Sequence, residues 1–479
     1  MSFISISFFI YFCLLLSIYW LFPSRARNLI LLAASYVFYA FWDWRCLILI
    51  SLSILVDFVA GLGMGAKLES AGQNAITGRK LWLYASLCFQ LGVLGVFKYF
   101  NFFADSLYHI SSLLPFNIPL YHLRIVLPIG ISFYTLRTMT YVIEVYRGKI
   151  QPTSNLRDYA LFVSFFPTLI AGPIERAQTL LPQIAAERHF DTGRFNEGMQ
   201  LIFWGLFKKV YVADNLSVIT GGIVKGPGVS GINVIILAYA YAFQIYADFS
   251  GYTDIARGCA KCLGFDLMRN FNYPYLAVNP SNFWQRWHIS LSSWLRDYLF
   301  QPLGGALRGM PKAYRNLAIT MFLAGLWHGA SWPFVIWGVY QGCLMIGHRI
   351  MQPHLKQLGF PFRRALPRSM RNMVKIAFTF QLTCYGWLIF FSPSMSEVLK
   401  MTRALFNTTG VVDVQQVFLL AQFVGPLALI EMIGYWRSDD HVHRFFNLPG
   451  WTKAAAYASL LYMMALHGAA AQSFIYARF

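Results

Sequence analysis

Charged side chains are scarce in this chain of 479 residues. They make up 12% of it, whereas 57% of the residues are hydrophobic and 18% are aromatic. Soluble globular domains carry charge at nearer a quarter of their positions, so the composition excludes an ordinary soluble protein. No polar stretch is long enough to build a soluble core of its own. We therefore expect an all-α, polytopic membrane protein of roughly eleven to thirteen membrane segments, some of them re-entrant.

Acidic residues are about half as frequent as basic ones, 20 against 39, which leaves a formal charge of +19. A charge of this size is typical of nucleic-acid-binding proteins, but here the cations stand in short clusters between apolar runs. The positive-inside rule and anionic headgroups explain that pattern, so nucleic acid is not expected as a partner. The clusters are Arg25/Arg27, Arg79/Lys80, Lys208/Lys209, Arg363/Arg364 and Arg368/Arg371.

Cysteine provides no disulfide framework, because the chain has seven cysteines, an odd number, scattered mostly through apolar runs. Cys259 and Cys262 form a C-x-x-C pair. A structural zinc site needs four ligands, and no second pair or matching histidine spacing follows this one. We expect no metal site and interpret the pair as ordinary helix packing.

Several familiar signatures are missing. The sequence has no P-loop and no G-x-G-x-x-G fingerprint, so no bound nucleotide cofactor is expected from a phosphate cradle. No internal repeat of the kind that marks many transporters is evident. The first apolar run, residues 3–22, lacks the preceding positive charge of a signal peptide and is followed by Arg25 and Arg27. It is therefore predicted to be an uncleaved first membrane span.

One stretch of 32 residues, 316–347, has no Asp, Glu, Lys or Arg, and His328 is its only ionisable side chain besides Tyr340 and Cys343. As a single helix it would be roughly 48 Å long, against about 30 Å for a hydrocarbon core. A break is predicted at Gly329 and Pro333. His328 is then expected at depth, where it is either a functional group or a neutral imidazole bonded to a neighbouring carbonyl.

Residues 279–303 are predicted to form the clearest amphipathic helix of the chain, with Asn279 as N-cap and Pro280 in the first turn. Such a helix lies at a membrane interface or re-enters between spans. His288 on this helix is open to three interpretations: a catalytic partner, a headgroup contact or a structural residue. One face carries Phe283, Trp287, Leu291, Trp294, Leu295 and Tyr298, and another carries Arg286, Ser290, Ser293 and Asp297.

Polar residues interrupt two other apolar regions. Arg137 and Glu144 are seven residues apart and therefore on one helical face, where they either satisfy each other or line a polar channel. Arg176 follows the helix-ending sequence Ala-Gly-Pro and is placed to meet an anionic group or to pair with Glu175.

Residues 246–258, with the sequence YADFSGYTDIARG, are unusually polar for a position between two apolar stretches. They bring Asp248, Asp254 and Arg257 close together. Asp254 and Arg257 are three residues apart, which puts them within reach of each other on one helical face.

Several ordered blocks of this sequence resemble the membrane-bound O-acyltransferase family, and in particular its bacterial branch, which acetylates alginate and related exopolysaccharides and includes the D-alanyl transferase of teichoic acids. The pattern covers most of residues 27–350. The blocks are RNLILLAASYVFYAFWD (27–43), LPIGISFYTLRTMTYVIEVYRG (127–148), AGPIER (171–176) with LPQ (181–183), YADFSGYTDIARG (246–258), NFNYPYLAVNPSNFWQRWHISLSSWLRDYLFQPLGG (270–305) and GLWHGASWPFVIWG (325–338).

The resemblance implies one membrane domain over residues 1–479, with core motifs at about 125–350, accessory spans at 1–124 and 373–479, and a central cavity. It implies that His328 is the catalytic histidine and His288 the second histidine of the family. The further substrate or cavity candidates are Asn282, Trp284, Arg286, Trp287, Trp327, Asp248, Asp254 and Arg176. Three positions depart from the family pattern: Arg137 stands for Gln, Glu144 for Asp and Ser392 for Arg.

The resemblance also implies the reaction. An acetyl group is expected to pass from a cytosolic thioester, acetyl-CoA as donor substrate with no bound cofactor, to hydroxyls of an extracytoplasmic polysaccharide or to a partner protein that completes the transfer. The expected location is the bacterial inner membrane. Two alternatives remain open: D-alanyl transfer to teichoic acid from a carrier-bound donor, and a transporter of acyl groups or lipids that makes no bonds, in which intramembrane His, Asp and Arg line a pathway.

Overall fold

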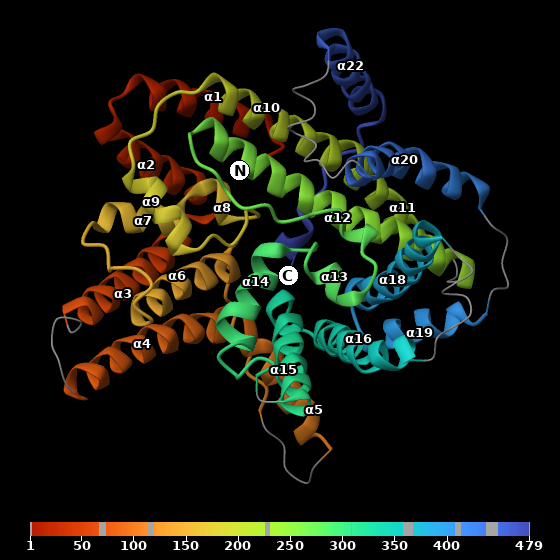
Figure 1. The fold of residues 1–479 in the computed structure, drawn as a ribbon, viewed down its shortest axis with the longest axis horizontal. Helices are drawn as coiled ribbons and strands as arrows, with labels where there is room; N and C mark the ends of the chain where they lie inside the picture. The colour runs from red at the N-terminus through yellow and green to blue at the C-terminus, as the bar shows by residue number, and fades with distance from the viewer. Residues whose placement is uncertain are drawn as a thin grey trace. The chain divides into compact units, whose positions relative to one another are not determined.

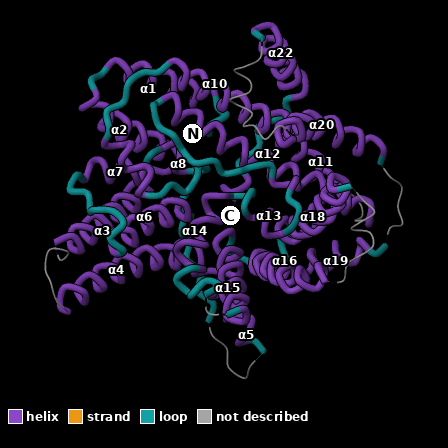
Figure 2. Tube along the Cα trace, viewed as in Figure 1, coloured by secondary structure: helices purple, strands orange, loops and turns teal. Residues whose placement is uncertain are grey.

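The structure is a computed structural model, and it describes residues 2–66, 73–113, 119–225, 230–307, 309–357, 367–407, 413–436 and 449–478. Within these ranges the chain forms helices joined by loops, and no strand occurs there (Figure 2). The prediction of an all-α protein is confirmed. The chain divides into two compact units, Met1–Met199 with Ala256–Met268 and Gln200–Ile255 with Arg269–Phe479.

Five helices in the described ranges are long and apolar enough to cross a membrane, which makes the chain a multi-pass membrane protein. A shorter apolar helix covers most of the expected first span, at Ile6–Leu21. The cluster Arg363/Arg364 lies outside the described residues. The five helices are Cys46–Ala66, Ile76–Ser111, Gly231–Cys262, Arg368–Phe391 and Val414–Trp436.

Three helices of the first unit lie side by side: α3 (Cys46–Ala66), α4 (Gln73–Leu94) and α6 (Ile131–Tyr146) (Figure 1). The carboxylate of Asp57 on α3 is buried and accepts hydrogen bonds from Ser86 Oγ at 2.5 Å and Gln90 Nε2 at 2.9 Å on α4. These bonds pair the polar groups of two apolar helices. The other helices of this unit are α1 (Ile6–Leu21), α2 (Ser24–Asp43), η1 (Gly95–Tyr99), α5 (Phe100–Ser111), α7 (Leu156–Ser164), α8 (Phe166–Leu169) and α9 (Ala177–Ala185).

Arg137 and Glu144, both on α6, bond to the backbone of other segments. The buried guanidinium of Arg137 donates to the carbonyls of Val163 at 3.0 Å and Thr168 at 2.6 Å, at the ends of α7 and α8. Glu144 accepts the main-chain N–H of Gln178 at 3.2 Å. Arg137 therefore satisfies carbonyl groups that the two helix ends leave without an intrahelical partner.

The second unit is built from the helices that follow residue 199. α10 (Thr192–Leu206) and α12 (Gly231–Cys262) contribute to both units. The remaining elements are η2 (Phe207–Ala213), α11 (Asp214–Lys225), η3 (Pro274–Leu276), α13 (Pro280–Trp284), α14 (Ile289–Leu295), η4 (Arg296–Phe300), α15 (Met310–His328), α16 (Trp332–Gln357), α18 (Arg368–Phe391), α19 (Met395–Leu405), α20 (Val414–Trp436), α22 (Gly450–His467) and η5 (Ile475–Arg478).

The prediction of one continuous helix over 279–303 is wrong. Asn279 caps α13 as expected, with its side chain accepting the N–H of Asn282, but α13 ends after five residues at Trp284. His288 then adopts a left-handed conformation with φ 43°, and α14 begins after it. A non-glycine residue in this region costs roughly 1–2 kcal/mol, so the surrounding contacts must impose the break.

The predicted break after His328 is confirmed. α15 ends at His328 and α16 starts at Trp332, so the apolar stretch consists of two helices joined by a short turn. Gly329 is required in this turn, because a Cβ there would lie 2.1 Å from the ring of Phe334. Gly325 on α15 and Gly338 on α16 let the two helices pack closely. A Cβ at either position would clash with the backbone of the other helix.

Candidate active site

His328, at the C-terminal end of α15, is 2% exposed and is surrounded by aromatic rings. Its ring centroid lies 5.0 Å from that of Trp327, 4.9 Å from that of Trp337 on α16 and 5.4 Å from that of Phe390 on α18. Three helices of the second unit therefore hold the imidazole in an aromatic shell.

His288, the residue before α14, is fully buried, and Asn270 fixes its protonation pattern. Its Nδ1 lies 3.1 Å from Asn270 Oδ1. The same oxygen accepts the main-chain N–H of Ser290 at 3.1 Å and the hydroxyl of Ser290 at 3.0 Å. Because a main-chain N–H can only donate, the Asn270 atom that faces it and His288 must be the amide oxygen, which accepts. The hydrogen of the neutral His288 ring is therefore on Nδ1, and Nε2 carries the lone pair.

Burial lowers the pKa of His288 to about 3, because the charged imidazolium loses its hydration there. The ring is consequently neutral near pH 7. A fully buried ring does not meet a lipid headgroup, which leaves the catalytic and the structural interpretations of His288.

The two histidines lie close together, with ring centroids 6.5 Å apart. Trp327 contacts both, at 5.8 Å from His288 and 5.0 Å from His328. Because His288 precedes α14 and His328 ends α15, two helix termini of the second unit converge at this point.

Tyr476 completes this group, and the sequence interpretation missed it. Its ring centroid is 5.6 Å from that of His328, 6.5 Å from that of His288 and 4.4 Å from that of Phe249. Tyr476 lies on η5, and Figure 1 marks this end of the chain beside α13 and α14. No motif around residue 476 signals such a position. Asn270, which the sequence interpretation also did not single out, lies in a quoted block but has no recognisable spacing to His288.

Among the tryptophan candidates, Trp327 belongs to the histidine pair and Trp284 lies one ring further out, 5.8 Å from Trp337. Trp287 is fully buried in a stack with Phe283 at 5.6 Å and Trp387 at 4.7 Å, which is a packing role. Trp337 is also fully buried, and no acceptor within the described residues bonds its indole N–H. The indole N–H groups of Trp284 and Trp287 also lack an acceptor there, and a buried donor of this kind calls for a partner.

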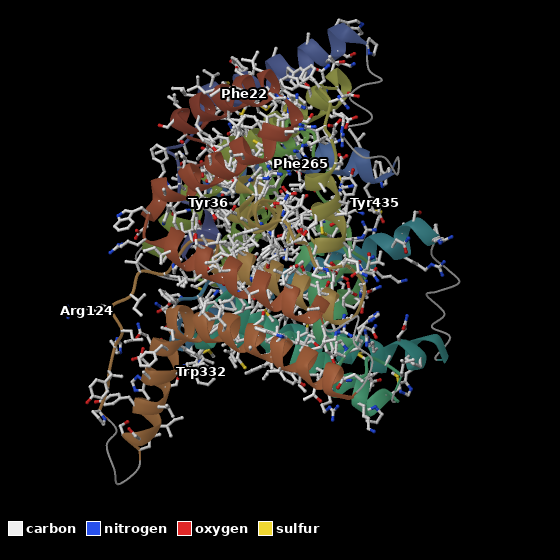
Figure 3. The ribbon with its side chains drawn as sticks, turned by 90° about the vertical axis from the view of Figure 1, so that its left-hand side faces the viewer. Phe22, Tyr36, Arg124, Phe265, Trp332 and Tyr435 are labelled. Atoms are coloured by element: carbon white, nitrogen blue, oxygen red, sulfur yellow. The ribbon has the colours of Figure 1, made fainter. Side chains whose placement is uncertain are left out.

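Asn282 and Arg286 bond to each other, with Arg286 Nε 3.1 Å from Asn282 Oδ1. The guanidinium of Arg286 also donates to the carbonyl of Asn272 at 3.1 Å and lies over the ring of Tyr435, 5.4 Å from its centroid. Figure 3 labels Tyr435, near the end of α20. The contacts described for these two candidates thus tie α13 to its neighbours.

The acidic candidates Asp248 and Asp254, both on α12, are paired with lysines of η2. Asp254 forms an ion pair with Lys208. Asp248 forms an ion pair with Lys209 at 2.7 Å. Both lysine side chains are buried in ion pairs, so the prediction that this cluster faces anionic headgroups is wrong.

The remaining candidate, Arg176, precedes α9 in the first unit, next to Glu175. Glu175 accepts the main-chain N–H of Met268 at 2.7 Å and the hydroxyl of Thr179 at 3.2 Å. All seven cysteines are free, and Cys259 and Cys262 are buried on α12. Within the ranges that the structure describes, no three His, Cys, Asp or Glu side chains are grouped as metal ligands.

The described residues form a helical membrane protein in which two buried imidazoles lie at converging helix ends. The sequence comparisons identify the family of this membrane protein. Residues 120–391 match the membrane-bound O-acyltransferase family. The chain belongs to this family and is a membrane-bound O-acyltransferase.

Three relatives show the similarity over most of the chain. The probable alginate O-acetylase AlgI of Azotobacter vinelandii is 40% identical over 83% of this chain and 76% of that protein. The probable alginate O-acetylase AlgI of Pseudomonas aeruginosa is 37% identical over 93% of this chain and 82% of that protein. A peptidoglycan O-acetyltransferase of Helicobacter pylori is 33% identical over 82% of this chain and 77% of that protein.

Proposed function

We propose that this protein transfers an acetyl group from acetyl-CoA, on the cytosolic side of the bacterial inner membrane, to hydroxyls of an extracytoplasmic polysaccharide, alginate or a similar exopolysaccharide. A partner protein outside the membrane receives the acetyl group or completes the transfer. The observation that carries this proposal is the buried pair His328 and His288, with ring centroids 6.5 Å apart. The names of the relatives, which describe O-acetylation of alginate and peptidoglycan, support the substrate class.

His328 acts as the general base in this proposal. Imidazole has an ordinary pKa of about 6.5, which suits proton transfer near neutral pH. It takes the proton of the acceptor hydroxyl while the hydroxyl oxygen attacks the thioester carbonyl. The new C–O bond forms, the C–S bond breaks, and the thiolate of CoA leaves with the proton that His328 returns.

His288 has a different part, because its Nδ1 hydrogen is committed to Asn270. A neutral ring with its lone pair on Nε2 accepts a hydrogen bond and cannot donate one to the thioester carbonyl. His288 therefore helps to orient the acceptor hydroxyl or His328. This protonation pattern excludes His288 as the donor that holds the carbonyl oxygen, and an indole N–H is an alternative donor.

The indole N–H of Trp337 is the donor that we assign to the carbonyl oxygen. Its ring is fully buried, lies 4.9 Å from that of His328, and its N–H lacks an acceptor within the described residues. A preorganised donor in a dry site stabilises the negative charge that develops on this oxygen in the transition state.

The test uses purified protein in lipid nanodiscs with labelled acetyl-CoA and an oligosaccharide of alginate. Release of CoA and labelling of the oligosaccharide are measured for the wild type and for His328→Ala. We expect CoA release from the wild type and labelling of the oligosaccharide once the extracytoplasmic partner is added, and neither above background from the variant. Polymer acetylation by a folded His328→Ala protein would contradict the role of His328.

The alternatives give different results in the same assay. A D-alanyl transferase turns over only with a D-alanyl group on a carrier protein. A transporter makes no CoA from any thioester, even when the extracytoplasmic partner is added. Either result would contradict the proposed reaction.

A further inference from the structure

A segment of loop and short helix, residues 468–476, brings Tyr476 to the histidine pair, and a buried charged cluster holds this segment. We name the cluster the lysine clamp, which consists of Lys209 on η2, Asp214 on α11 and Asp248 on α12. Lys209 Nζ lies 2.7 Å from Asp214 Oδ1 and 2.7 Å from Asp248 Oδ1. All three side chains are at most 2% exposed.

Each member of the lysine clamp also bonds the backbone of residues 472–475. Lys209 Nζ donates to the carbonyl of Gln472 at 3.0 Å. Asp248 Oδ2 accepts the main-chain N–H of Ile475 at 2.7 Å. Asp214 accepts the main-chain N–H of Gln472. Three side chains from three helical elements therefore fix both a donor and an acceptor of Gln472 and the donor of the residue just before Tyr476.

The charges of the lysine clamp require this segment. One ammonium faces two carboxylates, so the cluster carries a net charge of −1 in a buried site. A buried charge is costly unless other groups compensate it. The two main-chain N–H groups of residues 472 and 475 supply that compensation. The two carboxylates raise the pKa of Lys209 in spite of its burial, so the ammonium stays charged.

Apolar contacts beside the lysine clamp align the rings. Phe474 packs on Tyr252 of α12 with ring centroids 4.4 Å apart, and Tyr252 also lies under Lys209 Nζ at 5.6 Å. Phe474 and Tyr476 both contact Phe249, at 5.9 and 4.4 Å. The backbone is thus held by charge and the side chains by packing, and Tyr476 has little freedom to leave the histidines.

We infer that the lysine clamp is a positioning device for acetyl transfer, in which Lys209, Asp214 and Asp248 hold the backbone of residues 472–475 so that Tyr476 stays against His288 and His328. This inference rests on the proposed function for its kinetic consequence, but not for its structural one. Lys209, Asp214 and Asp248 touch neither histidine in the contacts described, so they are positioning residues.

The test disrupts the lysine clamp while the net charge of the cluster stays at −1. Lys209→Met combined with Asp214→Leu deletes one positive and one negative charge and removes both contacts to Gln472. The buried isoleucine at position 475 is also replaced by cysteine (Ile475→Cys), both in this variant and in the otherwise unchanged protein. Labelling at this position reports whether the segment is in place. A maleimide reagent and mass spectrometry of the peptide measure labelling there in nanodiscs, against protein without the Ile475→Cys replacement.

We expect little labelling of position 475 in the otherwise unchanged protein and at least tenfold faster labelling in the clamp variant. The kcat for acetyl transfer should fall on the order of 10²-fold, as for a misplaced catalytic group. The KM for acetyl-CoA should stay within about threefold, because the proposed reaction site at the histidine pair does not include the lysine clamp. Position 475 remaining protected in the clamp variant would overturn the inference.

A double-mutant cycle with Tyr476→Leu separates positioning from general destabilisation. If the lysine clamp acts through Tyr476, the clamp variant has almost no further effect on kcat once Tyr476 is gone. If instead the effects of the clamp variant and of Tyr476→Leu on kcat multiply, the lysine clamp acts elsewhere, and the inference is overturned. Lys261→Met, which breaks a half-buried ion pair with Glu197 in the first unit, is the matched control and should change neither labelling nor kcat by more than about threefold.

The two proposals fail separately. Absence of CoA release from the wild type would contradict the proposed function, yet the labelling of position 475 would still decide whether the lysine clamp holds the segment. Normal turnover together with a protected position 475 in the clamp variant would leave the proposed function intact and overturn the positioning role.

Discussion

Asn270 Oδ1 lies 3.1 Å from His288 Nδ1 and so determines which nitrogen of a candidate catalytic ring carries its hydrogen. The same oxygen accepts two bonds from Ser290, at 3.1 and 3.0 Å, which also hold the first turn of α14. One amide therefore couples the left-handed backbone of His288, with φ 43°, to the protonation pattern of its ring.

Asn270→Ala should lower both stability and activity. It leaves three buried donors without their acceptor, and each unsatisfied group costs about 1–3 kcal/mol unless water or a neighbour replaces it. The expected loss in the free energy of unfolding is at least about 2 kcal/mol, seen as a lower thermal midpoint in detergent. Ser292→Ala, which removes a single hydrogen bond to the carbonyl of Trp287, should cost about 1 kcal/mol or less. Equal losses in the two variants would contradict the role of Asn270.

His288 should make the protein less stable in acid. The folded state keeps this ring neutral down to a pKa of about 3, whereas the unfolded chain protonates it near pH 6.5. Between these values the unfolded state binds one more proton, so the free energy of unfolding falls by about 1.4 kcal/mol for each pH unit below about 6.5.

The measurement compares the thermal midpoint of wild type and His288→Gln between pH 7.5 and 5. The wild-type midpoint should decline more steeply, with a difference worth about 2 kcal/mol at pH 5. His354→Gln, at an exposed position of α16, should follow the wild-type curve. Parallel curves for wild type and His288→Gln would show that burial does not hold this ring neutral.

Trp337→Phe should reduce turnover more than stability. The phenyl ring keeps most of the packing against His328 but removes the indole N–H that we assign to the carbonyl oxygen. Loss of one such donor typically lowers kcat by about 10²–10³-fold. Trp294→Phe, at another buried indole, which packs on Tyr298 at 5.1 Å, should change kcat by less than about threefold. A wild-type kcat in Trp337→Phe would remove this tryptophan from the mechanism.

Gly329→Ala should displace His328. The new Cβ would lie 2.1 Å from the ring of Phe334, which in turn packs on Phe390 at 4.8 Å. Overpacking of this kind costs about 1–3 kcal/mol, and movement of the adjacent histidine should lower kcat on the order of 10²-fold.

Gly347→Ala is the matched control on α16, because a Cβ there meets open space. It should leave turnover unchanged and raise stability by up to about 1 kcal/mol, since alanine favours a helix. If both glycine variants turn over like the wild type, the turn after His328 does not need glycine.

The sequence by itself determined the features that a few neighbouring residues encode. Low charge and long apolar runs give a helical membrane protein, and Gly329 with Pro333 gives the break that ends α15 at His328. Asn279 and Pro280 correctly mark the start of α13. These are local preferences of backbone and solvation, so they act wherever such residues stand in a chain.

Only the tertiary structure decided what meets at the two histidines. Helical periodicity extended 279–303 through His288, but the bonds to Asn270 break the helix there. Charge clustering predicted that Lys209 faces anionic headgroups, whereas it is buried between partners from two other helices. Ile475 and Asp248 are 227 residues apart, and nothing near residue 475 reveals this bond. Contacts across such distances depend on the packing of whole helices, which local sequence does not specify.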